Sequence, residues 1–155
     1  MVGVVLIGLR IEPYAGPRED LRRSFELAED SREQLDAHLG VGTVLVARVG
    51  GELAGHVQLV GDEITNVAVA ADHRRRGIGR ALVEAALALA RADGCSAVRV
   101  ATAAADVDNL RFYQRVGFRM RSIERDAFTP ATGYAPGLEV EGIPLRDRVW
   151  LDIDV

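Results

Sequence analysis

Residues 72–82 read DHRRRGIGRAL, so a run of arginines leads through two glycines into an alanine- and leucine-rich segment. A helix N-terminus presents unpaired backbone N–H groups and about half a positive charge, and it therefore attracts phosphate. Glycine lets the backbone approach a ligand closely, and arginine adds charge and forked hydrogen-bond donors. The pattern predicts a site for a diphosphate or polyphosphate. The alternative is a solvated helix entrance whose glycines only shape the turn.

Two other phosphate-binding motifs fit this chain poorly. A dinucleotide-binding fold requires a third glycine where this chain has Leu82, and an acidic residue about 20 positions after the glycine turn, where residues 97–99 supply none. A P-loop requires a lysine, and all 19 Lys and Arg residues of the chain are arginine. The lack of lysine also excludes enzymes that form a lysine Schiff base.

Composition indicates one ordinary globular domain over residues 1–155, with 48% hydrophobic and 27% charged residues. Cys95 has no partner for an internal disulfide, and we interpret it as a small buried hydrophobe in a reducing compartment. We expect a cytoplasmic protein without a membrane segment, because no apolar run approaches the roughly 20 residues of a span. A net charge of −4 and 5% aromatic residues argue against nucleic acid as a partner.

Charge is unevenly distributed along the chain. Residues 72–125 hold 11 arginines and 6 acidic residues, whereas acidic residues predominate in the remainder. This distribution suits a domain that binds one anionic and one cationic ligand.

Hydrophobic periodicity and turn residues predict an α+β domain, or mixed-sheet α/β domain, with about seven strands in a mostly antiparallel sheet and about four helices. Ser31, with Gln34 three positions later, resembles a capping box, and Gly50-Gly51 is typical of a hairpin turn. The predicted helices cover residues 18–29, 31–39, 77–92 and 106–116, and the predicted strands cover 4–11, 43–49, 52–60, 63–70, 97–102, 118–125 and 148–155, with a loop over 126–146.

Two motifs together resemble a known family. Arg74-x-x-Gly77-x-Gly79, after the strand NVAV, is similar to the pyrophosphate loop of the GNAT superfamily of acyl-CoA-dependent N-acetyltransferases. About 35 residues downstream, NLRFYQRVGFR resembles the second signature of that family, a helix with a tyrosine followed by Gly-Phe at the next strand. The resemblance implies a GNAT-like fold in which two central parallel strands splay to hold the cofactor.

The resemblance also implies a reaction, the direct attack of a primary amine on acetyl-CoA, with no metal and no covalent enzyme intermediate. Tyr113 would protonate the departing thiolate, and Glu63 would take the amine proton through water. Core packing of Tyr113 and a solvated strand-end position of Glu63 are the alternatives. His56 and His73 are weaker candidates. The residues expected to bind the cofactor are Val67, Ala68, Val69, Arg74, Arg75, Arg76, Gly77, Ile78, Gly79, Arg80, Asn109 and Tyr113.

One stretch departs from the family pattern. Residues 102–106 read TAAAD where the most similar subgroup has a sequence like TGNSS, and Asn109 replaces the missing polar contacts only in part. This departure favours the alternative of a CoA-binding sensor or regulatory module that has lost catalysis.

The sequence leaves the acceptor amine open among small molecules, aminoglycosides, polyamines, peptide N-termini and protein lysines. We expect the first helices and residues 126–146, with Phe128, Tyr134, Glu139 and Glu141, to shape its pocket, and an acidic rim would favour a cationic amine. An exposed strand edge or the Trp150 face would also allow two copies to form a homodimer.

Overall fold

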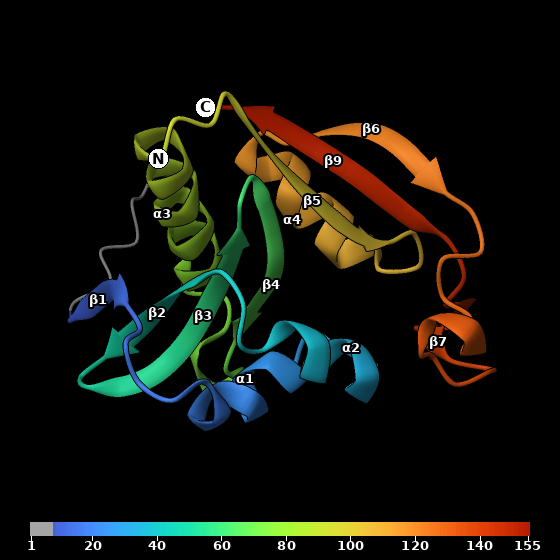
Figure 1. Cartoon of the computed structure of the whole chain (residues 1–155), viewed down its shortest axis with the longest axis horizontal. Coiled ribbons are helices and arrows are strands. Elements are labelled where there is room, and N and C mark those ends of the chain that lie inside the picture. Colours follow the sequence, from blue (N-terminus) through green and yellow to red (C-terminus); the bar gives the residue numbers. More distant parts are fainter. Residues whose placement is uncertain (1–7) are drawn as a thin grey trace.

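The computed structural model describes residues 8–155, which form a seven-stranded mixed sheet with helices on both faces (Figure 1). Only β4 and β5 pair in parallel among the described strands, so the predicted mixed, mostly antiparallel sheet is confirmed. The predicted first strand lies partly in residues 1–7, outside the described residues. In sheet order the strands are β1 (Leu9–Pro13), β2 (Thr43–Val49), β3 (Glu52–Val60), β4 (Glu63–Val69), β5 (Ala97–Ala103), β9 (Arg148–Asp154) and β6 (Arg119–Glu124).

Alternation along β2 places the two hydrophobic cores on opposite faces of the sheet. Leu45 and Ala47 point into the larger core, beneath α3, and Val44 and Val46 point into a smaller core beneath α1 and α2. The helices are α1 (Arg22–Glu26), α2 (Arg32–His38), α3 (Ile78–Ala92) and α4 (Val107–Val116), with 3-10 turns at Arg18–Leu21, Ala71–His73 and Pro130–Thr132.

The prediction of one continuous helix over residues 18–29 was wrong. A 3-10 turn leads into the short α1, which ends at Glu26. Leu21 and Phe25 are buried, whereas Leu27 is 51% exposed, so no apolar contact holds a further helical turn on the sheet. The chain after α1 is therefore free to form a loop beside α2.

The N-terminus of α2 is capped, but not by the reciprocal box that the sequence suggests. The Oγ atom of Ser31 accepts a hydrogen bond from the backbone N–H of Gln34 at 3.2 Å. The Gln34 side chain, however, donates to the backbone carbonyl of Thr132 at 3.0 Å. This side chain therefore ties α2 to the segment that follows β6.

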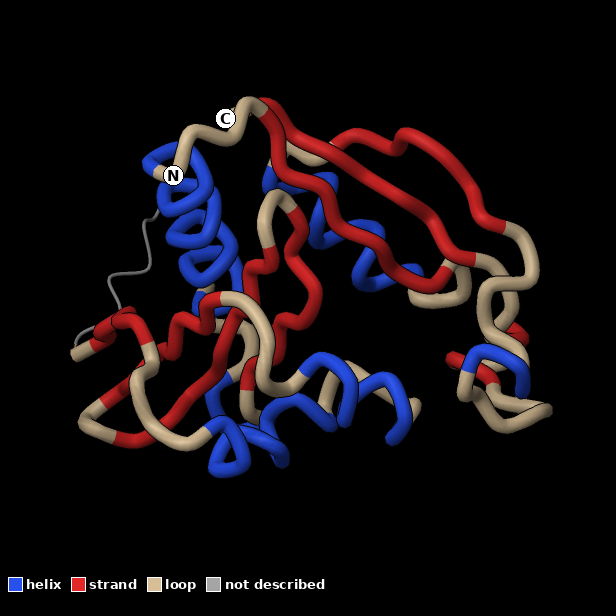
Figure 2. Tube along the Cα trace, viewed as in Figure 1, coloured by secondary structure: helices blue, strands red, loops and turns tan. Residues whose placement is uncertain are grey.

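That segment, residues 126–146, contains a 3-10 turn and a small hairpin of β7 (Glu139–Val140) and β8 (Ile143–Pro144) instead of loop alone. Figure 2 shows it at the right of the view, where the chain passes from β6 to β9. The Tyr134 hydroxyl donates to Oε1 of Glu29 at 2.7 Å, across 105 positions of sequence. The segment thus closes on the loop between α1 and α2. No helix in the described range is long and apolar enough to cross a membrane.

Candidate functional site

The two central parallel strands separate soon after they begin. Their pairing consists of Glu63 with Arg99 and Ile64 with Val100. Beyond Ile64, β4 continues to Val69 with no partner strand on that side among residues 8–155. Figure 1 shows β4 and β5 diverging from this point. The splayed geometry leaves backbone N–H and C=O groups of β4 available to a ligand.

A cavity of about 520 Å³ lies where the arginine–glycine turn joins β4, α3 and α4. It is lined by Val67, Val69, His73, Arg74, Arg75, Gly77, Ile78, Gly79, Arg80, Asp108, Asn109, Phe112, Tyr113, Arg115 and Val116. We call it the turn cavity. It brings together most of the residues that the sequence predicts for the cofactor, although they come from three separate elements.

The turn has the local geometry of an anion-binding site. Gly77 caps α3 with a left-handed backbone (φ +80°), and the first turn of α3 carries no acidic residue that could neutralise its N-terminus. The Nε atom of Arg74 donates to the carbonyl of Val69 at 3.1 Å and so fixes the turn to the end of β4. Arg75 is also left-handed (φ +62°), a conformation that costs a non-glycine residue free energy and that occurs often at ligand sites.

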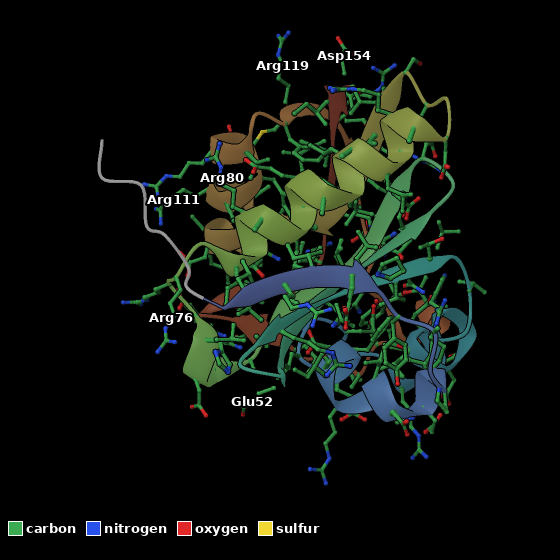
Figure 3. The ribbon with its side chains drawn as sticks, turned by 90° about the vertical axis from the view of Figure 1, so that its left-hand side faces the viewer. Glu52, Arg76, Arg80, Arg111, Arg119 and Asp154 are labelled. Carbon is green, nitrogen blue, oxygen red and sulfur yellow. The ribbon has the colours of Figure 1, made fainter. Side chains whose placement is uncertain are left out.

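Most of the predicted cofactor residues line the turn cavity, but two of them do not. Arg76 and Ala68 do not line the turn cavity, and Ala68 is buried opposite His56 on β3. Arg115 on α4 does line it and was missed by sequence reasoning, because only the packing of α4 brings it to the turn. Arg80 links the two helices, since its Nη1 donates to the Arg115 carbonyl at 3.3 Å while its Nε pairs with Glu84 at 2.9 Å. In Figure 3, Arg76, Arg80 and Arg111 all lie along one side of the molecule.

Tyr113 projects from α4 into the core between the strands. Its ring is 5% exposed and makes edge contacts with Phe112 and Phe118, at centroid distances of 5.0 and 5.5 Å. Burial raises the pKa of Tyr113 well above its usual value, and the nearby carboxylate of Asp106 raises the pKa further. The phenol is therefore protonated at neutral pH and can act as a donor.

Residues 102–106 (TAAAD), which differ from the family pattern, hold α4 in place. Asp106 caps the helix by accepting from the backbone N–H of Asn109 at 3.0 Å, and the Asn109 side chain donates to Oγ1 of Thr102 at 3.3 Å. Asn109, which lines the turn cavity, thus connects β5 to α4.

A second cavity, of about 360 Å³, also has Tyr113 in its lining. We call it the acceptor cavity, because it is lined by Phe128 and Tyr134, which the sequence predicts for the acceptor pocket. It shares Val67, Asn109 and Tyr113 with the turn cavity. Further residues of its lining are Phe25, Glu29, Asp30, His38, Gln58, Glu63, Thr65, Asn66, Asp106, Phe128, Tyr134, Arg148 and Trp150.

The acids of the acceptor cavity differ from those expected. Phe128 and Tyr134 line it as predicted, but Glu139 and Glu141 do not, because Glu139 begins β7 and Glu141 lies in the β7–β8 turn. Glu29 and Asp30, from the loop between α1 and α2, were missed. No local sequence signal marks these two residues as part of a pocket.

Glu63 lies on the wall of the acceptor cavity with its side chain 24% exposed. Its Oε1 atom pairs with Nη2 of Arg99 at 3.3 Å. The Arg99 guanidinium also lies over the Trp150 ring, 5.3 Å from its centroid. Glu63 is therefore neither fully solvated nor free of ionic partners.

His56 does not face either cavity. Its ring is fully buried and stacks on Phe25 at a centroid distance of 4.2 Å. Nε2 contacts Oδ1 of Asn66 at 2.8 Å, and an amide oxygen only accepts, so Nε2 carries the proton and Nδ1 accepts from the Ser24 hydroxyl at 2.6 Å. Burial lowers the pKa of His56 to about 4, which makes it a neutral structural residue.

Acidification is expected to destabilise the protein through His56. Between pH 6.5 and about 4 the unfolded imidazole is protonated and the folded one is not, so the free energy of unfolding falls as the pH falls. The fall reaches about 3 kcal/mol. Urea unfolding at pH 7 and pH 4.5 measures it, and His56→Gln, which lacks this titration, should show a smaller change. Equal pH dependence in the two proteins would contradict a buried neutral His56.

His73 lies at the rim of the turn cavity, as the last residue of the 3-10 turn before the arginines. Its Nε2 is 3.6 Å from Oε2 of Glu52, and its buried Nδ1 has no hydrogen-bond partner among the described residues. Within residues 8–155, no group of three or more His, Cys, Asp or Glu side chains is placed to hold a metal ion.

Comparison with known proteins agrees with this geometry. The profile of the acetyltransferase (GNAT) family matches residues 10–118. The uncharacterized N-acetyltransferase YvbK of Bacillus subtilis (strain 168) is 32% identical over 152 residues, which cover 95% of this chain and 97% of that protein.

Two crystal structures have closely similar folds. One is a Bacillus subtilis acetyltransferase in complex with CoA, with a TM-score of 0.86 and 32% identity over 95% of this chain and 99% of that one. The other is an IAA acetyltransferase from Bacillus cereus ATCC 14579, with a TM-score of 0.83 and 30% identity over the same shares of the two chains. With its splayed strands, its arginine–glycine turn and these relatives, the chain belongs to the GNAT family of acetyltransferases.

Proposed function

We propose that the protein transfers an acetyl group from acetyl-CoA to a primary amine by direct attack, without an acetylated enzyme. One observation carries the proposal: the turn cavity and the acceptor cavity are separate except at Val67, Asn109 and Tyr113, which line both. Two substrates that enter from opposite sides would therefore meet beside the Tyr113 hydroxyl.

Acetyl-CoA fits the turn cavity in one orientation. Its pyrophosphate would bind the free amides at the start of α3 together with Arg74, Arg75 and Arg80. Its pantetheine arm would pair with the edge of β4 that faces away from β3, from Val67 to Val69. The CoA complex of the Bacillus subtilis acetyltransferase, 32% identical to this chain, supports CoA as the ligand class.

The proposed chemistry uses two proton transfers. The amine attacks the thioester, and a backbone N–H near Val67 stabilises the oxyanion. Tyr113, which burial keeps protonated, supplies a proton to the sulfur as the C–S bond breaks. Glu63 takes the ammonium proton through water, and a water chain alone is the alternative. The pH dependence of kcat/KM in Glu63→Gln tests this assignment, because loss of the base should remove the acidic limb of the profile.

The experiment that tests the function is thiol release from acetyl-CoA in the presence of a panel of amines, with the acetylated product identified by mass spectrometry. We expect an N-acetyl product and free CoA in equal amounts. The alternative function, a CoA-binding sensor, is favoured by the TAAAD stretch. Calorimetry that shows CoA binding without turnover on any amine would support the sensor and contradict the enzyme.

We also propose that two copies pair through β6, the strand at the edge of the sheet, whose six residues are all exposed. Antiparallel self-pairing of RMRSIE would set Met120 opposite Ile123 and Arg119 opposite Glu124, which are favourable cross-strand pairs. Trp150, the other predicted dimer surface, lines the acceptor cavity. Sedimentation equilibrium should find a dimer in the wild type and a monomer in Met120→Glu, and a wild-type monomer would refute the pairing.

A further inference from the structure

The acceptor cavity is lined by more acidic than basic side chains. Its lining includes four carboxylates, from Glu29, Asp30, Glu63 and Asp106, and one arginine, Arg148. Not all of these charges are available to a ligand, because several have partners within the protein. The specificity of the cavity therefore depends on which of them remain unpaired.

Three of the charges are already compensated. Glu63 forms the ion pair with Arg99, and Asp106 caps the positive N-terminus of α4. The Arg148 guanidinium pairs with Glu124 at 3.3 Å and lies over the ring of Phe128, 5.0 Å from its centroid.

Glu29 and Asp30 have no such compensation. The Oε1 atom of Glu29 accepts hydrogen bonds from the Tyr134 hydroxyl at 2.7 Å and from the Ser31 backbone N–H at 2.9 Å, and both of these donors are neutral. Among the described residues, neither carboxylate forms an ion pair with an arginine or histidine. The hydrogen bonds from Tyr134 and Ser31 hold the Glu29 carboxylate in place without removing its charge.

The acidic character continues outside the acceptor cavity. A neighbouring hollow on the surface of α1 and α2 shares Glu29, Asp30 and Leu35 with it and adds Glu26. The other acids of that hollow, Glu19 and Asp36, both pair with Arg22. Arg32 also lines the hollow, but with five acids and two arginines its lining remains net negative. An incoming cation would therefore meet negative charge before it reaches the cavity.

The remaining walls of the acceptor cavity are suited to an aliphatic chain. Phe25, Phe128, Tyr134 and Trp150 contribute aromatic surface, against which methylene groups can pack. A volume of about 360 Å³ accommodates a small flexible molecule rather than a folded protein segment.

We propose that the acceptor is an aliphatic diamine or polyamine, whose reacting amine lies beside Tyr113 and whose second ammonium group binds the carboxylates of Glu29 and Asp30. This inference rests on the proposed function, because it assigns the second substrate of the same site. It goes beyond that function in naming the charge that distinguishes a good acceptor from a poor one.

Three amines of matched length test the inference: 1,5-diaminopentane, hexylamine and 6-aminohexanoate, which end in an ammonium, a methyl group and a carboxylate. We expect kcat/KM with acetyl-CoA to be at least 30-fold higher for the diamine than for hexylamine, and lowest for 6-aminohexanoate. Equal kcat/KM for the diamine and hexylamine would overturn the inference while leaving acetyl transfer intact.

The double variant Glu29→Gln with Asp30→Asn removes the charges and keeps the hydrogen-bonding shape, since glutamine can still accept from Tyr134. The KM for 1,5-diaminopentane should rise at least tenfold, and the preference for the diamine over hexylamine in kcat/KM should fall by a similar factor. Glu139→Gln, at an exposed position of β7 that does not line the cavity, is a control for loss of an acid elsewhere in the protein. An unchanged KM in a variant that melts like the wild type would overturn the assignment of these carboxylates.

Calorimetry of 1,5-diaminopentane with the CoA complex separates the two proposals. Charge-selective binding that the double variant loses, without turnover, would uphold the diamine site and refute the transfer reaction. Turnover of hexylamine with no measurable preference for the diamine would uphold the transfer reaction and refute the diamine site.

Discussion

Tyr113→Phe is expected to lower kcat about 100-fold, because loss of a positioned general acid removes a factor of that order. The fall should be the same with every amine acceptor, since the hydroxyl acts on the departing sulfur. Affinity for CoA, measured by calorimetry, should change little, because the proposed pyrophosphate site lies at the arginine–glycine turn and not at Tyr113.

The variant should fold normally. Phenylalanine preserves the edge contacts of the ring with Phe112 and Phe118, and among residues 8–155 none forms a hydrogen bond with the Tyr113 hydroxyl. Tyr14→Phe is the matched control, because the Tyr14 hydroxyl donates to the Pro17 carbonyl at an exposed site away from both cavities. A Tyr113→Phe enzyme with wild-type kcat would remove Tyr113 from the mechanism and leave it a core residue.

Gly79→Asp is expected to weaken CoA binding at least 100-fold, a loss of about 2.7 kcal/mol. Gly79 lies in the first turn of α3 and lines the turn cavity, so an added carboxylate would occupy the anion site and repel a pyrophosphate. The same carboxylate interacts favourably with the helix N-terminus, by about 0.3–1 kcal/mol, so the variant should be at least as stable as the wild type.

Gly79→Ala separates the effect of charge from that of bulk. A Cβ atom at this position would lie 3.5 Å from the Phe112 ring and 3.6 Å from Cγ2 of Val69, which are ordinary contacts. We expect less than a tenfold change in the CoA dissociation constant, measured by calorimetry. If Gly79→Asp binds CoA as tightly as Gly79→Ala does, the pyrophosphate does not bind at the start of α3.

The fold and the arginine–glycine turn could be predicted from the sequence because their signals are local. Consecutive residues encode the turn. Gly77 supplies the left-handed N-cap, and the apolar spacing that follows defines α3. The strands were predictable for the same reason, since β3 and β9 alternate or run apolar between clear turn residues.

The acceptor cavity could not be predicted in this way, because its walls meet only in the folded chain. Glu29 and Tyr134 are 105 positions apart and are joined by one hydrogen bond. The ending of α1 at Glu26, which frees the loop that carries Glu29, depends on the lack of apolar contacts beyond Phe25. Arg115 reaches the turn cavity only because α4 packs beside α3.

The directions of the three consecutive arginine side chains could not be predicted from the sequence either. Spacing alone could not tell which of Arg74, Arg75 and Arg76 face a ligand, because the left-handed backbone at Arg75 changes the direction of the side chains on either side. The structure places Arg74 and Arg75 on the turn cavity and leaves Arg76 outside it.

A crystal structure with acetyl-CoA bound would test most directly whether the two cavities are the two halves of one active site. We expect the pyrophosphate on the amides and arginines of residues 74–80, the pantetheine arm along β4, and the thioester sulfur within hydrogen-bond reach of the Tyr113 hydroxyl with its carbonyl carbon open to the acceptor cavity. A cofactor that binds elsewhere, or a thioester that points away from Tyr113 and is sealed from the acceptor cavity, would contradict the account.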